Sequence, residues 1–151
     1  MKEIHVECLP DEALVKKLGY TKKKIIHHSG KAKVFGKLKK STNLIAMVDE
    51  DPNSPQSSYE KRLVLVNEEY GVKVYKDNLG NKIIILKVKL EDWLINACKI
   101  SKIKLSTFGL PSNANDFHDV NTHKIPNLEK LIDELLLKEN PAMLRLKEKL
   151  K

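Results

Sequence analysis

The segment NLIAMVDEDPNSP, residues 43–55, decides the fold and raises the question of function. Its run NLIAMV is apolar at every position after the asparagine, as expected of a parallel strand that is buried on both faces. Asp49, Glu50 and Asp51 follow directly, before residues that form turns. In an extended chain Asp49 and Asp51 point to the same side and repel each other unless a cation lies between them. The segment therefore predicts a buried strand that ends at a site for a divalent cation.

Strands and helices alternate around this segment. Short apolar runs, typical of strands, are separated by stretches with the apolar period of amphipathic helices, and this order indicates an α/β sheet with right-handed crossovers. We therefore predict a small Rossmann-like α/β fold with a mostly parallel sheet flanked by helices. The expected elements are strand 3–7, helix 10–20, strand 24–29, helix 30–41, strand 43–48, helix 57–71, a hairpin over 72–88 that turns at 78–81, and helix 90–100.

The last third of the chain has a different pattern. Residues 1–104 form the predicted α/β core, whereas residues 105–127 are rich in Ser, Asn and Asp without a period and predict an irregular loop. Residues 128–151 predict two amphipathic helices, the second beginning at Pro141 after an Asn140 cap. We expect both helices to pack on the same domain.

Composition narrows the choice of partners and compartment. The net charge of +8 and a pI near 9.4 favour an anionic partner, nucleic acid before membrane, although a lysine-rich composition also follows from an AT-rich genome. Two cysteines are too few for a disulfide framework or a cysteine zinc site. No apolar run is long enough to span a bilayer, and the first residues lack the apolar core of a signal peptide. We expect a cytoplasmic protein that does not insert into membranes.

Acidic residues follow several of the predicted strands. Glu7 ends the first strand, Asp49 and Asp51 end the central one, and Glu91 follows the hairpin. In open α/β sheets chemistry gathers at the carboxyl ends of the strands. Carboxylates that converge there repel one another unless hard cations with oxygen ligands neutralise them. The pattern predicts Mg²⁺ or Mn²⁺ at this edge.

The ordered set of these motifs resembles the Toprim domain. VECLPDEALVKKLG resembles its opening strand and glutamate, with matches at Glu7 and Asp11, although Cys8 stands where Gly is usual; IAMVDEDP resembles its Asp-x-Asp motif at Asp49 and Asp51. HHSGKAKVFGKL and VKLEDWL resemble the Gly-Lys segment and the Glu-Asp motif of the Toprim domains in overcoming-lysogenization-defect nucleases. The resemblance covers roughly residues 3 to 95.

The resemblance implies metal-dependent phosphodiester chemistry on DNA or RNA. Topoisomerases and primases need further domains that 151 residues cannot supply, so a small nuclease is the expected activity. Carboxylates would hold two cations, and a lysine would stabilise the charge that builds on the phosphate. The implied residues are Glu7 and Lys31 for catalysis, Glu7, Asp11, Asp49, Asp51 and Glu91 for metal, and Lys31, Lys33 and Lys37 for nucleic acid.

Other interpretations of the same residues stay open. Glu7 and Asp11 also suit a solvated strand end and a helix start, the aspartate pair suits a turn, and Glu91 suits a helix start. Lys33 and Lys37 equally suit a solvated helix face. Asp116, His118, Asp119 and His123 are metal-ligand types, but in a polar loop they more often have no such role. A degenerate Toprim-like module that binds a protein partner without catalysis is the alternative to a nuclease.

Overall fold

The buried segment forms strand β3 at the centre of a six-stranded sheet, in a computed structural model that describes residues 2–151. The strand order is β2-β1-β3-β6-β5-β4; the first four strands of this order run parallel, and β5 runs antiparallel to both of its neighbours, β6 and β4. The strands are β1 Ile4–Val6, β2 Ile25–His27, β3 Ile45–Asp49, β4 Val64–Glu69, β5 Val72–Lys76 and β6 Lys82–Leu86. The predicted α/β class and the hairpin between β5 and β6 are confirmed.

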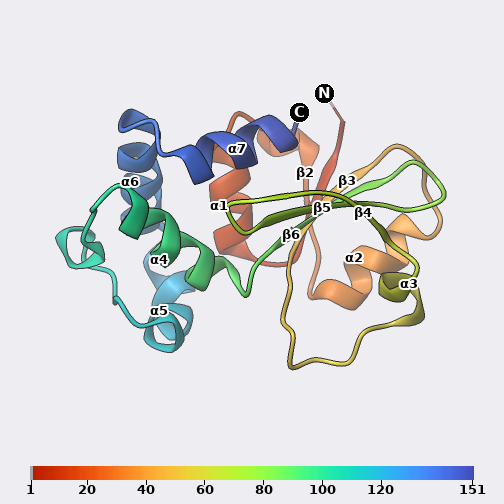
Figure 1. Ribbon diagram of the computed structural model, residues 1–151, viewed down its shortest axis with the longest axis horizontal. Coiled ribbons are helices and arrows are strands. Elements are labelled where there is room, and N and C mark those ends of the chain that lie inside the picture. Colours follow the sequence, from red (N-terminus) through yellow and green to blue (C-terminus); the bar gives the residue numbers. More distant parts are fainter. Residues whose placement is uncertain (1) are drawn as a thin grey trace.

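Helices cover both faces of the sheet (Figure 1). Helices α2 and α3 pack on one face, and α1, α4, α6 and α7 contribute to the larger core on the other. Alternate residues of β3 enter the two cores, since Ile45 and Met47 face one and Ala46 and Val48 the other. The α-helices are α1 Leu9–Lys17, α2 Lys31–Leu38, α3 Ser58–Lys61, α4 Leu90–Ile100, α5 Ala114–Val120, α6 Ile125–Leu137 and α7 Pro141–Lys149; short 3-10 turns span Lys22–Lys24, Leu105–Phe108 and Asn121–His123.

The predicted helix 57–71 is wrong beyond its first turn. Helix α3 ends at Lys61, and β4 follows as the edge strand beside β5. The run Val64–Val66 has the β-branched character of a strand, and the free edge of β5 supplies its hydrogen-bonding partner. Pairing with β5, which lies later in the chain, therefore overrides the local helical pattern.

The predicted irregular loop 105–127 is also wrong, because it contains helix α5 and two 3-10 turns. Asn113 caps α5 by accepting hydrogen bonds from the backbone N–H groups of Asn115 and Asp116, and Phe117 anchors the helix in the core. The two C-terminal helices are confirmed, with α6 packed on α1 and Asn140 capping α7. Among the helices of residues 2–151, none has the length and hydrophobicity of a membrane span.

Asn81 connects β6 to the end of α2 and offers a test of the fold. Its fully buried side chain accepts a hydrogen bond from Leu44 N and donates to the carbonyls of Leu38 and Ser41. Asn81→Ala removes the partner of the Leu44 N–H and of the Ser41 carbonyl, while the Leu38 carbonyl keeps its hydrogen bond from Ser41 N. The free energy of unfolding in urea should therefore fall by about 2 to 4 kcal/mol. The exposed Asn96→Ala on α4 should change it by no more than about 0.5 kcal/mol. Equal effects of the two variants would contradict this role.

Candidate functional site

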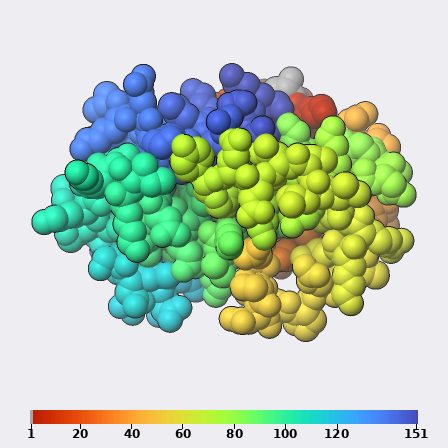
Figure 2. Space-filling view, in the orientation of Figure 1, coloured from red at the N-terminus to blue at the C-terminus, as the bar shows by residue number. Residues whose placement is uncertain are grey.

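The carboxyl ends of β1, β3 and β6 lie at one edge of the sheet because these strands are neighbours and parallel. We call this the carboxylate edge; it is made by Glu7, Asp11, Asp49 and Glu91. The segment that follows β3 and helix α5 both lie along the lower margin of the molecule in Figures 1 and 2. Among the acids expected at this edge, Glu7 contacts the backbone of Asp49, and the charges of Glu7 and Glu91 act on the Asp49 carboxyl.

Glu7 and Asp49 tie the ends of the two central strands together. The Oε1 atom of Glu7 accepts a hydrogen bond of 2.9 Å from the backbone N–H of Asp49. Asp49 in turn accepts one of 2.9 Å at Oδ1 from the backbone N–H of Leu90, the first residue of α4. The edge is thus held by carboxylates that bridge β1, β3 and α4.

Asp11 lies beneath this pair in the first turn of α1. Its side chain is 1% exposed, and neither carboxylate oxygen has a hydrogen-bond partner of ordinary geometry among residues 2–151. Burial raises the pKa of Asp11 well above its usual range. The charge of Asp49 raises this pKa further, and the charges of Glu7 and Glu91 add smaller effects. The nearby Cys8 thiol lowers it, but only in part. A buried carboxyl without a partner is costly, which marks Asp11 as an unsatisfied part of the edge.

Asp49 and Glu7 are also held against ionisation. Burial raises the pKa of Asp49 to about 7, with further contributions from the charges of Glu7 and Glu91. Burial likewise raises the pKa of Glu7, although the hydrogen bond from Asp49 and the charge of Lys31 oppose the rise. Mutual repulsion in a partly buried site is the condition that a bound cation relieves.

The three consecutive acids at the end of β3, Asp49, Glu50 and Asp51, have different partners. Glu50 turns away and pairs its carboxylate with Lys73 Nζ at 2.5 Å, as the alternation of a strand predicts. Asp51 lies beyond the strand at a φ of +45°, and its carboxylate accepts a hydrogen bond of 2.7 Å from Ser54 Oγ. Its charge nonetheless raises the pKa of Glu7, so Asp51 lies at the rim of the carboxylate edge. The extended geometry that the sequence implied for both aspartates is therefore wrong at Asp51.

Lys31 begins α2 beside the edge. Its Nζ donates to the carbonyl of Glu50 at 3.0 Å and lies 3.4 Å from the carboxylate of Glu60. Its charge also lowers the pKa of Glu7. Lys31 is thus close enough to influence the site, but its ammonium is already engaged. Lys33 and Lys37 are exposed on α2, near His28. Burial and the charge of His27 lower the pKa of His28, and the charges of Lys37 and Lys33 lower it further.

Glu91 has partners that the sequence-based prediction missed. It is 3% exposed, and its Oε1 lies 2.5 Å from Nδ1 of His118, while its Oε2 accepts a hydrogen bond of 3.3 Å from Asn121. The charge of His118 also lowers the pKa of Asp49, which places this imidazole near the edge. Both partners come from the segment expected to be an irregular loop. The only sequence signal for them was the Asn113 cap that starts α5.

The donor chemistry of the carboxylate edge fits a hard cation such as Mg²⁺ or Mn²⁺. Asp11 has two unpartnered oxygens, and Asp49 Oδ2 accepts no hydrogen bond from the described part of the chain. Across residues 2–151, however, no group of three or more His, Cys, Asp or Glu side chains is arranged to hold a metal ion. An ion would therefore have to draw the carboxylates together.

Comparison of the chain with protein-family models, with characterised proteins and with solved structures finds no match.

Proposed function

We propose that this protein catalyses Mg²⁺- or Mn²⁺-dependent cleavage of phosphodiester bonds in nucleic acid, as the resemblance to Toprim nucleases implies. The observation that carries the proposal is the meeting of Glu7, Asp11, Asp49 and Glu91 at one edge, where burial and like charge oppose the ionisation of Asp11 and Asp49. The net charge of +8 favours a polyanionic substrate.

Each residue of the edge has a role in this proposal. Glu7, Asp49 and Asp51 would hold the cation, with Asp11 behind them. When bound, Mg²⁺ or Mn²⁺ would place positive charge beside the phosphate oxygens and would lower the pKa of the water bound to it. Glu7, whose pKa burial raises, is suited to accept a proton from the attacking water.

Charged groups around the edge complete the proposed site. Lys31 would exchange its contact with Glu60 for a phosphate oxygen and so stabilise charge that develops on the phosphate. Glu91 would fix the orientation of the His118 imidazole through Nδ1, while the His118 side chain as a whole is 60% exposed. We assign Glu91 as a positioning residue, in place of the metal ligand expected from sequence, because His118 and Asn121 occupy both its oxygens.

The direct test is cleavage by the purified protein. Supercoiled DNA, nicked DNA, single-stranded DNA and RNA would each be incubated with millimolar Mn²⁺ or with EDTA. Cleavage of at least one substrate in Mn²⁺ and none in EDTA is the expected result. A protein that is inert on all four substrates in Mn²⁺ would favour the second candidate below.

The second candidate is a Toprim-like module that binds a protein partner without catalysis. It is favoured by the lack, within residues 2–151, of side chains already arranged to hold a metal, and by Cys8 at a position where the family usually has Gly. Mn²⁺ binding distinguishes the two candidates, because a nuclease must bind the ion and a non-catalytic module need not.

A further inference from the structure

A groove runs along helices α2 and α3 from Asp51, at the rim of the carboxylate edge. Its first part is a cavity of about 280 Å³ lined by Lys31, Asp51 and Glu60 among others. Its second part is a cavity of about 580 Å³ lined by Arg62 and residues of the β5–β6 turn. Lys39 lines both cavities, so they adjoin at this side chain. We call the two cavities together the α2–α3 groove.

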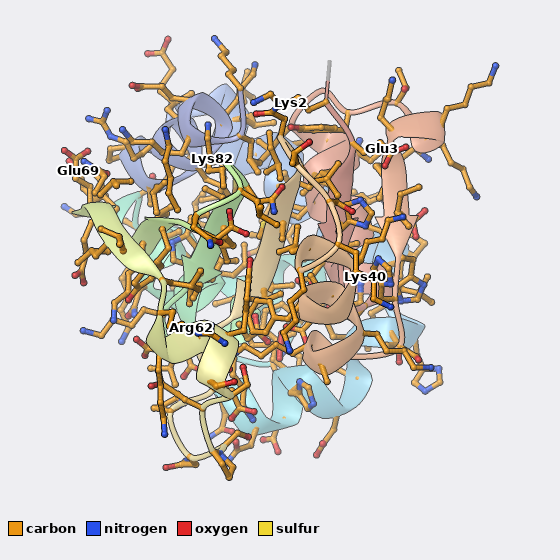
Figure 3. The ribbon with its side chains drawn as sticks, turned by 90° about the vertical axis from the view of Figure 1, so that its right-hand side faces the viewer. Lys2, Glu3, Lys40, Arg62, Glu69 and Lys82 are labelled. Atoms are coloured by element: carbon orange, nitrogen blue, oxygen red, sulfur yellow. The ribbon has the colours of Figure 1, made fainter. Side chains whose placement is uncertain are left out.

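Two cations of the α2–α3 groove are available to a ligand. Lys39 is exposed, and its Nζ lies 5.9 Å from the centroid of the Tyr59 ring. Arg62 is exposed, and its Nε donates to the carbonyl of Ser58 at 3.2 Å, while its two terminal nitrogens have no hydrogen-bond or ion-pair partner among residues 2–151. In Figure 3 Arg62 lies at the end of α3, where it follows the last helical residue. Both Lys39 and Arg62 line the larger cavity.

The acids of the groove are engaged by neighbouring groups. Glu60 lies 3.4 Å from Lys31 Nζ. Asp77 accepts a hydrogen bond from the Tyr59 hydroxyl at 2.7 Å, and it accepts further ones from the backbone N–H of Leu79 and from Asn81. Such donors stabilise the ionised form of a carboxylate, so Asp77 keeps its negative charge. In the larger cavity, however, the two cations Lys39 and Arg62 outnumber this single acid, so that part of the α2–α3 groove attracts phosphate.

The lysines expected from sequence to bind nucleic acid lie elsewhere on α2. Lys31 and Lys39 are eight residues apart, so they share one face of the helix and line the groove. Lys33 and Lys37 instead lie close enough to His28 to lower its pKa, beside β2. The same helix thus carries two sets of lysines, of which only one adjoins the carboxylate edge.

We propose that the α2–α3 groove binds one strand of nucleic acid through its phosphates, with Lys39 and Arg62 as contacts, and so connects the bound strand to the carboxylate edge. The identity of the ligand rests on the proposed function. The larger cavity, of about 580 Å³, has the volume of a small-molecule site, which suits one strand better than a duplex. The rings of Phe35 and Tyr59 are buried in its wall, so binding depends on phosphate rather than base stacking.

The test measures binding without cleavage. A fluorescein-labelled oligothymidylate of roughly ten nucleotides is titrated with the full chain in EDTA, at salt concentrations from about 50 to 200 mM, and anisotropy gives the affinity. The Lys39→Glu, Arg62→Glu double variant should bind at least about tenfold more weakly. Its slope of log affinity against log salt should be shallower by about 1.4, because each single-strand phosphate contact contributes about 0.7.

The control is the Lys33→Glu, Lys37→Glu double variant. It changes the net charge of +8 by the same amount at two positions of α2 outside the groove, and it should leave affinity and slope unchanged. The milder Lys39→Gln, Arg62→Gln variant should give a smaller loss in the same direction, and thermal melting verifies that each variant folds.

Three results would overturn the proposal: no binding by the wild type, a larger loss in the control variant, or equal losses in both, which net charge alone explains. The outcome is separable from that of the proposed function. Weaker binding by the groove variant, in a protein that cleaves nothing in Mn²⁺, would support the groove and reject the nuclease.

Discussion

Asp49→Asn is expected to abolish Mn²⁺-dependent cleavage, with a loss of about 10²- to 10³-fold or more in rate. The amide keeps an oxygen that can accept the hydrogen bond from Leu90 N, so the link between β3 and α4 survives. The variant removes the negative charge of Asp49. That charge raises the pKa of Asp11, and the charges of Glu7 and Glu91 in turn raise the pKa of Asp49. Initial rates of cleavage with the best substrate measure the effect, and Glu7→Gln should have a similar one.

The matched control for Asp49→Asn is Glu50→Gln. Glu50 is the next residue and also an acid, but its carboxylate pairs with Lys73 and takes no part in the carboxylate edge. Its substitution should change the cleavage rate by less than about threefold, since it removes one ion pair near the surface. If the two variants lose activity equally, the carboxylate edge is not the catalytic site.

The second large effect is a dependence of stability on pH. The pKa of Asp49 is about 7 in the folded protein, above its ordinary value of 3.8, so the folded state binds the proton more tightly than the unfolded state. This contribution to stability is fully present below about pH 4 and is lost as pH rises toward and through 7. The loss between pH 5 and pH 8 should be roughly 2 to 4 kcal/mol, and the raised pKa of Asp11 adds to it.

Urea unfolding at several pH values measures this loss. Below about pH 6.5 the buried His5 and the half-buried His28, whose pKa values burial lowers, contribute the opposite slope. The quantity to compare is therefore the difference between wild type and Asp49→Asn at each pH. The variant should be the more stable of the two at pH 8, and the difference should shrink toward pH 5. The exposed Asp119→Asn should follow the wild type, and a parallel course of wild type and Asp49→Asn would contradict the pKa given for Asp49.

The sequence was sufficient to predict the central part of the fold. The apolar run before Asp49 has residues for both faces of the sheet, and in the structure Ile45 and Ala46 enter different cores. The turn at residues 78–81 likewise indicated the β5–β6 hairpin. These features are local, because the period of the pattern and the turn residues are contained in the segment itself.

The elements that depend on distant partners could not be predicted in this way. Strand β4 forms because β5 offers a free edge, and helix α5 is held by one buried residue, Phe117, and a capping asparagine. The same limit applies to the carboxylate edge. Sequence order placed Glu7 beside Asp49, but the engagement of Glu91 by His118 and the turn at Asp51 depend on packing between segments far apart in the chain.

The most direct test of a cation at the carboxylate edge is a crystal soaked in millimolar Mn²⁺ at pH 8, where Asp49 is ionised, with anomalous scattering recorded for manganese. We expect an anomalous peak in contact with the carboxylates of Glu7 and Asp49, at metal–oxygen distances of about 2.0 to 2.6 Å. That peak should be absent from crystals of Asp49→Asn treated in the same way. A wild-type crystal with no peak at this edge, or with manganese bound only elsewhere, would contradict the proposed metal site and with it the nuclease.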